Sequence, residues 1–506
     1  MKRKIVTLEE LSKISEEYKK NGKSIVHCHG SYDVLHTGHI HHFKAAKTQG
    51  DILVVTLTAD RYIDKGPNRP ECKENLRAVT LAALEDVDYI TVIEDPTGLP
   101  AIEAIKPSVY VKGSEFKEGK DITNRVKSEF DLVKMFGGRV YITEEITFSS
   151  SKMVNRANLS NEAFAFVDRF SDEISTKEIA DSLEDLRGMK ALVIGDTIID
   201  EYHYVSPLER PPKETMIASK FLYGESFAGA TLAAANHLAG FLDNVDLITC
   251  LGSDSSTNYE DFIVKNLKSN ISPTFFYRDD APTVIKRRYI EEAFLKKLFE
   301  ICFIEETDMP ENISRNISEY IGDVAKNYDL VMAADFGHGL LEGRVINALE
   351  SQSKFLAVTT QTNESNSGYN PITKYLRADY VCIDEPEVRF STHDRFGDLE
   401  KVVTNLASLR EYQKFSITRG HKGSLMYSKD EGFIEIPVFS GFGIKDTIGA
   451  GDAYFAVTSP YVVAGNSLKN VGFLGNAVGA LAVNIIGNKE SIDRSMVTKF
   501  VNSLLK

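Results

Sequence analysis

Two histidines lie three residues apart in a short segment that could bind phosphate. The segment Gly-Ser-Tyr-Asp-Val-Leu-His-Thr-Gly-His occupies residues 30–39, and its histidines are His36 and His39. It follows a predicted strand at 24–29 and opens a predicted helix. The first turn of a helix offers unpaired N–H groups and a partial positive charge, and Gly38 lets the backbone approach a ligand. We therefore expect both imidazoles to act as imidazolium groups that face nucleotide phosphates and stabilise the charge developing there.

The same two histidines could instead cap the helix or bind zinc. A His-x-Gly-His pattern alone would be weak evidence for chemistry. Here the pattern stands between a first strand and a first helix and follows a Gly-x-x-Asp pattern. That context favours the phosphate site.

A second glycine-rich segment predicts another anion site. The residues Asp-Thr-Ile-Gly-Ala-Gly-Asp at 446–452 precede an apolar helix predicted over 453–463. Consecutive N–H groups at a helix start can form an anion hole, here from Gly449, Ala450 and Gly451. The Asp452 carboxylate is then placed to take a proton from an attacking hydroxyl. The alternative is that Asp452 only stabilises the start of the helix.

Alternating strands and helices must position the first segment. Apolar runs at 52–57, 89–93, 109–111 and 140–142 alternate with helical segments. This alternation predicts an α/β domain with a parallel, Rossmann-like sheet covered by helices on both faces.

The alternation restarts at 191–194 and predicts a second α/β domain. Between the two, the polar segment 158–187 has helical spacing around Phe164, Phe166, Val167 and Phe170. Its aromatic residues could pack between domains, against a second subunit, or in an ordinary core. We predict a first domain at 1–158, a helical linker at 159–187 and a second domain at 188–506.

Composition narrows the possible functions. The chain has 506 residues and a net charge of -14, which argues against a nucleic-acid surface. The longest apolar helical stretch, 471–487, is interrupted by asparagines, so we expect a buried helix and no membrane span. The five cysteines are scattered singly, at no metal-ligand spacing. We therefore expect a reducing, cytoplasmic compartment.

Over about residues 8–157 the chain resembles the cytidylyltransferase-like nucleotidyltransferase family. The likeness is greatest to the adenylyltransferase half of bifunctional heptose-phosphate kinase/adenylyltransferases. Besides the histidine segment, it covers Glu-Asn-Leu-Arg at 74–77, Val-Lys-Gly-Ser-Glu-Phe at 111–116 and Phe-Ser-Ser-Ser-Lys at 148–152. The resemblance implies catalytic roles for His36, His39 and Lys112, and an acceptor-binding role for Glu115. The nucleotide contacts it implies are Gly30, Tyr32, Asp33, Gly38, Arg77, Ser149, Ser150 and Ser151.

Taken singly, these additional matches have structural alternatives. Arg77 could be a surface helix residue, Lys112 a charge at a strand end, and Ser149 to Ser151 a helix cap. Their occurrence in family order favours the functional interpretation. Two departures, Ser114 and Glu115 in place of Gly and Asp, bear on the acceptor sugar.

The resemblance implies a reaction without a covalent intermediate. The phosphate of a sugar phosphate attacks the α-phosphorus of ATP or CTP in line, and pyrophosphate leaves. The protein contributes positioning and charge stabilisation. Mg²⁺ is the expected cofactor, and it usually binds through substrate phosphates and few carboxylates.

Over about residues 188–506 the chain resembles the ribokinase-like sugar kinase family, an α/β sandwich. The likeness covers the 446–452 segment, Gly-Asp-Thr-Ile-Ile-Asp at 195–200, Phe-Ala-Gly-Ala at 227–230, Asp-Glu-Pro-Glu at 384–387 and Thr-Arg-Gly-x-x-Gly at 418–423. It implies transfer of the ATP γ-phosphate to a sugar hydroxyl with Asp452 as base. The implied roles are sugar binding by Asp196, Asp200 and Gly229, nucleotide binding by Arg419, Gly420, Gly449, Ala450 and Gly451, and metal binding by Glu387.

Departures from that family pattern leave two hypotheses open. Ala228 and Leu232 replace a usual Gly and Asn, and 360–363 differs from the heptose kinases. The order of the two halves is also the reverse of that in the heptose enzymes. Either the protein is a bifunctional kinase and nucleotidyltransferase acting on a sugar and its phosphate, or the kinase-like half is a silent binding module. We also expect a homo-oligomer.

Overall fold

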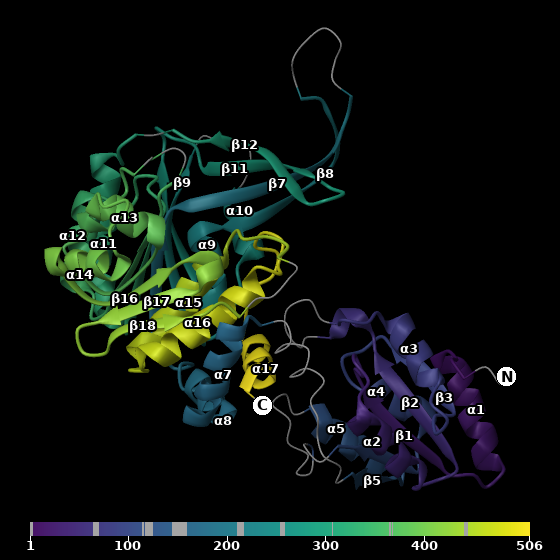
Figure 1. The fold of residues 1–506 in the computed structure, drawn as a ribbon. Coiled ribbons are helices and arrows are strands. Elements are labelled where there is room, and N and C mark those ends of the chain that lie inside the picture. Colours follow the sequence, from purple (N-terminus) through teal and green to yellow (C-terminus); the bar gives the residue numbers. More distant parts are fainter. Residues whose placement is uncertain are drawn as a thin grey trace. The chain divides into compact units, whose positions relative to one another are not determined.

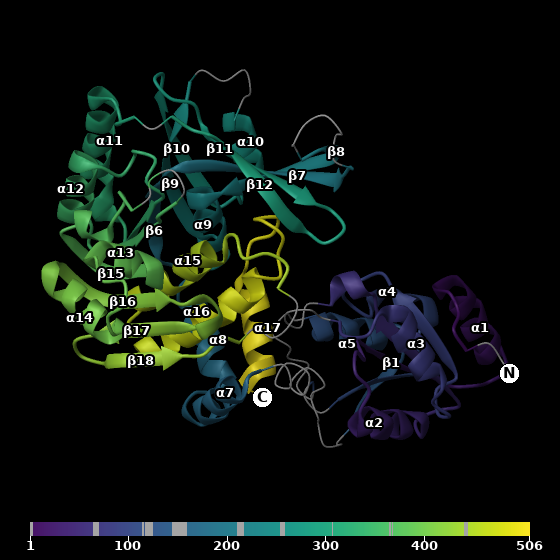
Figure 2. The same cartoon turned by 45° about the horizontal axis from the view of Figure 1, so that its top comes forward.

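The computed structural model describes residues 4–63, 70–113, 116, 125–143, 159–209, 217–253, 259–305, 307–363, 366, 368–439 and 444–505. The chain divides into two compact units, one of residues 1–158 with 498–506 and the other of 159–497. Each unit is built around its own parallel sheet (Figures 1 and 2). The predicted α/β class is confirmed.

The first unit has five parallel strands in the order β3-β2-β1-β4-β5. The strands are buried apolar runs, as expected for a sheet covered on both faces. They are β1 (Ile25–Gly30), β2 (Ile52–Thr58), β3 (Tyr89–Ile93), β4 (Val109–Lys112) and β5 (Arg139–Ile142). The helices are α1 (Leu8–Lys20), α2 (Thr37–Lys47), α3 (Glu74–Ala82), α4 (Leu99–Ile105) and α5 (Arg125–Met135), with a 3₁₀ turn η1 (Asp60–Tyr62).

The strand order creates a switch point between β1 and β4. From β1 the chain moves outward to β2 and β3, and then returns across the sheet to β4 on the other side of β1. In open α/β sheets, ligands bind at the carboxyl ends of the strands where the order reverses. Gly30 ends β1 and Lys112 ends β4, so both predicted segments lie at this edge.

The second unit has a nine-stranded sheet in the order β10-β9-β6-β13-β14-β15-β16-β17-β18. It is parallel except for the last two strands, which pair antiparallel. The strands are β6 (Lys190–Gly195), β9 (Asn244–Gly252), β10 (Ile271–Arg278), β13 (Leu330–Asp335), β14 (Leu356–Thr360), β15 (Arg377–Asp384), β16 (Glu411–Thr418), β17 (Ser424–Ser428) and β18 (Gly432–Ile436).

Helices cover both faces of this sheet (Figure 1). The helices on one face are α11 (Glu311–Val324), α12 (Gly343–Gln352), α13 (Glu385–Thr392) and α14 (Leu399–Leu409). Those on the other face are α9 (Ala230–Leu238), α15 (Ala450–Val463) and α16 (Leu468–Ala482). The remaining elements are α10 (Tyr259–Asn266), α17 (Arg494–Leu505) and the 3₁₀ turns η3 (Ala325–Asn327), η4 (Ile372–Lys374) and η5 (Gly420–Lys422).

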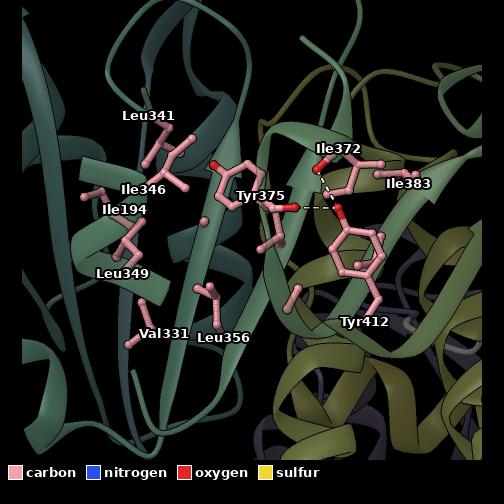
Figure 3. Packing of buried hydrophobic residues seen from close by; sticks show 14 of the residues in the cluster. Ile194, Val331, Leu341, Ile346, Leu349, Leu356, Ile372, Tyr375, Ile383 and Tyr412 are labelled. Atoms are coloured by element: carbon pink, nitrogen blue, oxygen red, sulfur yellow. Dashed lines mark hydrogen bonds between the residues drawn. The ribbon is translucent and has the colours of Figure 1, made fainter. Parts of the chain in front are cut away.

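The main core of the second unit lies between the sheet and the α11–α14 layer. Figure 3 shows Ile194, Val331 and Leu356 of neighbouring strands packed near Leu349 of α12. The buried hydroxyl of Tyr412 donates hydrogen bonds to two carbonyl oxygens of the η4 turn region. Its polar atom is thereby satisfied inside an apolar cluster.

A separate four-stranded sheet extends from one edge of the second unit (Figures 1 and 2). Its order is β12-β11-β7-β8, from β7 (Thr197–Pro207), β8 (Ser219–Gly229), β11 (Val284–Glu291) and β12 (Lys296–Phe303). We call it the small sheet. The sequence analysis did not predict it.

The segment expected as a linker forms α7 (Asn161–Glu173) and α8 (Thr176–Glu184). Phe166 and Phe170 of α7 are buried, and Phe170 packs on Phe473 of α16 with ring centroids 4.4 Å apart. Of the three alternatives for these aromatic residues, ordinary core packing therefore holds for Phe166 and Phe170. Among the described helices, none combines the length and apolar character that a membrane span requires.

Candidate functional sites

The two histidines of the first segment lie side by side at the start of α2. The ring centroids of His36 and His39 are 3.9 Å apart and the rings are stacked. Tyr32 places its ring edge-on against His39. Gly30 leaves room for this, because a Cβ there would lie 3.1 Å from the Tyr32 ring. The sequence prediction that both imidazoles share one face of the helix start is confirmed.

His36 is also the N-cap of α2. Its Nδ1 accepts a hydrogen bond from the Gly38 N–H at 3.1 Å. An accepting Nδ1 carries no proton, so the ring is neutral with its proton on Nε2. Burial also lowers the pKa of His36. The capping alternative therefore holds for His36, and its expected stabilisation of phosphate charge stays a prediction.

Arg77 is fully buried rather than exposed on α3. Its guanidinium donates to the carbonyl oxygens of Cys72, Ser31 and Thr58, and pairs with Asp60 at 2.7 Å. The surface alternative is wrong. Since Nε, Nη1 and Nη2 all contact protein oxygens, Arg77 organises the loops that follow β1 and β2 instead of presenting a free cation.

Asp33 also holds a loop. Its carboxylate accepts the N–H groups of Glu71 and Cys72 at 3.0 and 2.9 Å. The backbone before α3 is thus fixed to the segment that carries the histidines. The structure gives Asp33 this positioning contact, whereas the sequence analysis expected a nucleotide contact.

Lys112 lies at the switch point in a buried ion pair. Its Nζ is 2.9 Å from Glu129 Oε2 and 3.4 Å from the carbonyl oxygen of His29, which belongs to β1. The Glu129 carboxylate also accepts the Gly98 N–H and the Tyr110 hydroxyl. Burial favours protonation of Glu129, but Lys112 and the Gly98 N–H outweigh it, and the pKa of Glu129 is lowered. Glu129 is therefore an ionised carboxylate at neutral pH.

Glu129 was missed by the sequence analysis because it lies in no motif. Its only signal is its place on one face of a helix that follows β4, the strand of Lys112. The predicted residues Glu115, Ser149, Ser150 and Ser151 lie outside the described residues.

The second segment forms the start of α15. Gly449 is the N-cap with φ +79°, and a Cβ there would lie 2.3 Å from Asn488 Oδ1. Nothing lies within 4 Å of a Cβ built on Gly451. The backbone here is thus open for close approach by an anion, as the sequence predicts, and Ala450 begins the helix beside it.

Asp452 is a partly buried carboxyl group in the first turn of α15. Burial and the neighbouring Asp200 raise its pKa to about 7, while Lys286 acts in the opposite direction. A base that titrates near neutral pH is suited to general base catalysis. The alternative of a helix-stabilising charge requires the ionised form, which the raised pKa disfavours below neutral pH.

The small sheet places Asp200 beside this carboxyl. Asp200 of β7 pairs with Arg288 of β11, and burial raises its pKa despite that cation. A Cβ on Gly229 would lie 2.2 Å from Asp200 Oδ2. The glycine of the Phe-Ala-Gly-Ala turn is therefore required by the carboxylate that faces it.

Three cations of the small sheet were missed by the sequence analysis. Lys286 and Arg288 are two residues apart on β11, so their side chains lie on the same face of the small sheet. Asp200 of β7 stands opposite Lys286 in the strand pairing, so it lies on that face too. Lys297 of β12 lies 2.5 Å from Asp446, which starts the glycine-rich segment. Within the part of the chain that the structure describes, no hydrogen bond or ion pair engages the Lys286 ammonium. The Lys-x-Arg pattern in this strand was the feature of the sequence that could have identified Lys286 and Arg288.

Asp196 is buried at the end of β6. It accepts backbone N–H groups from Phe336, His338 and Leu340. Burial and the neighbouring Asp335 raise its pKa to about 6. Asp196 therefore holds the loop after β13 by hydrogen bonds to backbone groups. The Asp200 carboxylate has different neighbours, namely Arg288 and the turn that contains Gly229.

Glu387 does not fit a magnesium ligand. Its two carboxylate oxygens accept the N–H groups of Thr362 and Asp384 in a capping box at the start of α13. Burial and Asp384 raise the pKa of Glu387 well above its usual value. Both carboxyl oxygens are engaged in capping α13, and the metal role expected for Glu387 stays a prediction that these contacts do not support. No group of three or more potential metal ligands occurs among the described residues.

A pocket of about 820 Å³ lies at the carboxyl ends of β15 and β16. Arg419 and Gly420, both predicted nucleotide contacts, line it, and so do Arg389, Arg395 and Lys422. Arg419 is held by Glu435 at 2.8 Å. The size and the cationic lining suit a polyanionic ligand such as a nucleotide.

Comparisons with known proteins agree with both halves. Residues 27–181 match the cytidylyltransferase-like family model, and residues 189–494 match that of the pfkB family carbohydrate kinases. The chain therefore joins a cytidylyltransferase-like domain to a carbohydrate kinase domain. Because the kinase model spans more than half of its length, the chain belongs to the pfkB family.

Relatives among the curated proteins match the N-terminal region of the chain. The bifunctional protein HldE of Aliarcobacter butzleri is 39% identical over 138 residues, which is 27% of this chain and 29% of the relative. HldE of Geobacter metallireducens is 39% identical over 142 residues, again 27% of this chain and 29% of the relative. The chain thus spans less than a third of the length of these relatives.

Among solved structures, phosphofructokinase-2 from Escherichia coli, in its tetrameric inhibited form, covers 63% of this chain and 100% of its own. The TM-score is 0.50 and the sequence identity is 13%. At this identity the likeness shows the fold alone, and it confirms the ribokinase-like α/β architecture predicted for the second half.

Proposed function

We propose that the protein is a bifunctional enzyme. Its second unit phosphorylates a sugar phosphate with ATP. Its first unit activates a sugar 1-phosphate to a nucleotide sugar and releases pyrophosphate. The observations that support the proposal are the stacked rings of His36 and His39 at the start of α2, and the position of Lys112 at the end of β4, the strand next to β1.

In the transferase unit the substrate supplies its own nucleophile. A phosphate oxygen of the sugar phosphate attacks the α-phosphorus, the bond to the β-phosphate oxygen breaks, and pyrophosphate leaves. The N–H groups of α2, the Nε2–H of His36, the His39 ring and the Lys112 ammonium offset the charge on the phosphates during this step. No proton has to be removed from the attacking phosphate.

In the kinase unit the attacking group is a hydroxyl. Asp452 takes its proton as the oxygen–phosphorus bond forms, and ADP leaves with the electrons of the broken bond. The open backbone at 449–451 receives the transferred phosphoryl group. The cationic pocket at Arg419 accommodates the nucleotide.

Mg²⁺ is the proposed cofactor of both reactions. It would be held mainly by the nucleotide phosphates, whose charge it offsets. Glu387 is not proposed as its ligand.

Lys286 supports a phosphorylated sugar as the kinase substrate. Its ammonium is nearly buried, acts electrostatically on both Asp200 and Asp452, and has no hydrogen-bond or ion-pair partner among the described residues. A cation held in this position favours an anionic group on the molecule that reaches Asp452. A neutral sugar would leave it uncompensated.

We further propose a cytoplasmic homo-oligomer that acts in the synthesis of surface polysaccharide precursors. We favour ATP over CTP as the nucleotide of the transferase unit, because the loop at 111–116 resembles that of adenylyltransferases. This part of the proposal rests on relatives that match the N-terminal region of the chain.

A pyrophosphate-release screen tests the transferase assignment. The full chain is incubated with each of four nucleoside triphosphates and a panel of sugar 1-phosphates, and ADP formation is followed in parallel with a panel of sugars and sugar phosphates. We expect pyrophosphate release with at least one pair and ADP formation with a sugar phosphate. Wild-type protein that releases no pyrophosphate with any pair contradicts the assignment.

A second candidate is a nucleotidyltransferase with a catalytically silent kinase-like unit. The observation that favours it is Thr360, which stands where the heptose kinases have a different segment and whose buried hydroxyl has no hydrogen-bond partner among the described residues. If wild type and Asp452→Asn form ADP at the same background rate on every sugar tried, this candidate replaces the bifunctional one.

A further inference from the structure

Glu129 is the most enclosed charged group at the switch point of the first sheet. Its side chain lies on α5 and is almost completely buried. Each carboxylate oxygen has a partner. Oε1 accepts the Gly98 N–H at 2.7 Å, and Oε2 accepts the Tyr110 hydroxyl at 2.8 Å and faces Lys112 Nζ at 2.9 Å. The carboxylate therefore has little freedom to move.

Glycine is required at position 98 by this arrangement. A Cβ there would lie 2.9 Å from the Tyr110 hydroxyl and 3.1 Å from Glu129 Oε1. The chain before α4, the strand β4 and the helix α5 thus converge on one carboxylate. Such a fixed anion can hold a mobile lysine side chain in one place.

Lys112 uses only part of its hydrogen-bonding capacity on the protein. An ammonium has three N–H groups. One points to Glu129 and a second lies 3.4 Å from the His29 carbonyl oxygen. The third has no partner among the described residues. The rings of Tyr110 and Phe116 lie 5.3 and 5.4 Å from Nζ, which confines the ammonium further.

We propose that Glu129 is a positioning residue for the transferase reaction, and that its carboxylate holds the Lys112 ammonium at the carboxyl ends of β1 and β4 so that the remaining N–H meets the nucleotide phosphates. The inference rests on the proposed function of the first unit. It adds a residue that does not touch the substrate and acts only through Lys112.

A double-mutant cycle tests this dependence. Pyrophosphate release is measured for wild type, Glu129→Gln, Lys112→Gln and the double variant. We expect Lys112→Gln to lower kcat by about 10²–10³-fold, as for loss of one charge-stabilising donor, and Glu129→Gln by about 10–100-fold, as for loss of a supporting group behind a catalytic one. In the Lys112→Gln background, Glu129→Gln should cost less than about 2-fold, because residues that act as a unit are not additive.

Two further variants separate positioning from folding. Glu129→Asp keeps the charge and should recover a large part of the rate lost in Glu129→Gln. The matched control is Asp88→Asn, which breaks the Lys47–Asp88 pair and a backbone hydrogen bond to Leu53 at the opposite edge of the same sheet. It should lower the melting temperature without lowering kcat.

Several results would overturn the inference. They are full activity of Glu129→Gln, an equal loss in both Lys112 backgrounds, or a loss in Asp88→Asn as large as that in Glu129→Gln. Nucleoside triphosphate binding by calorimetry distinguishes this failure from failure of the proposed function. If wild type binds nucleotide but releases no pyrophosphate, the proposed function fails. The positioning role is still supported in that case if Glu129→Gln weakens nucleotide binding in the presence of Lys112 and has no effect on binding in the Lys112→Gln background. Unchanged binding in that case would overturn it.

Discussion

Asp452 is a carboxyl group whose surroundings favour the protonated form until the pH is near neutral. Burial is the main cause, and the charge of Asp200 adds to it. As a general base it must be deprotonated to accept the hydroxyl proton. We therefore expect kcat/KM of the kinase reaction to rise with pH, with a midpoint at about 7, and to level off above it. If kcat/KM does not change between about pH 5.5 and about pH 8.5, Asp452 is not the general base.

The raised pKa of Asp452 also predicts that the free energy of unfolding depends on pH. Its pKa of about 7 in the folded protein lies well above the value that an aspartate has in an unfolded chain. Ionisation therefore favours the unfolded chain, and the stability present at low pH is lost as the pH rises towards the folded pKa. Asp452→Asn removes this cost, so its melting temperature should exceed that of wild type by more at pH 8 than at about pH 4. Thermal unfolding at both pH values checks the difference, and a larger gain at the lower pH would contradict the sign.

Among the helices, α2 begins at a side chain, that of His36, to which we assign both a structural and a chemical role. His36 caps the helix through Nδ1, and we propose that its ring also contacts the nucleotide phosphates. Asparagine is a good N-cap but has no imidazole. We expect His36→Asn to retain the melting temperature of wild type and to lose pyrophosphate release, whereas His36→Ala should lose both.

Comparing the two variants decides between capping and catalysis. If His36→Asn restores the rate together with the stability, the histidine is only a cap. The cost of losing a cap is about 0.5–2 kcal/mol, which is large enough to appear in a thermal unfolding curve.

The elements differ in how well the sequence predicted them. Strands buried on both faces, such as β2 and β3, are continuous apolar runs and were expected almost at their observed limits. The small sheet was missed because its strands carry charges on one face and exposed rings on the other. Lys286 and Arg288 of β11 face the site, while Phe299 and Phe303 of β12 are exposed. Such strands have no continuous apolar run.

The residues of the candidate sites likewise fall into those that a sequence motif predicted and those that no motif predicted. His36, His39 and Asp452 belong to segments with a glycine pattern at a helix start, and the sequence contains that context. Glu129 and Lys286 reach their sites only through tertiary packing, from a helix and a strand without motifs. The contacts of Arg77 and Glu387 also depend on burial and on backbone groups far away in the sequence. Their side chains were expected to meet ligands, and they contact the protein instead.

At the scale of the whole molecule, two families share one chain and each unit carries its own site. The first unit places its residues at the switch point of a five-stranded sheet, and the second places Asp452 at the start of a buried helix beneath the small sheet. We propose that no residue of one candidate site takes part in the reaction of the other. Substitutions at one site should therefore leave the other reaction intact.

The most direct measurement is pyrophosphate release by full-length His39→Ala beside wild type, with ADP formation recorded on the same preparations. The account predicts a loss of about 10²-fold or more in pyrophosphate release and an unchanged rate of ADP formation with a sugar phosphate. Undiminished pyrophosphate release would contradict the role of the paired imidazoles. An equal loss of both reactions would contradict separate sites.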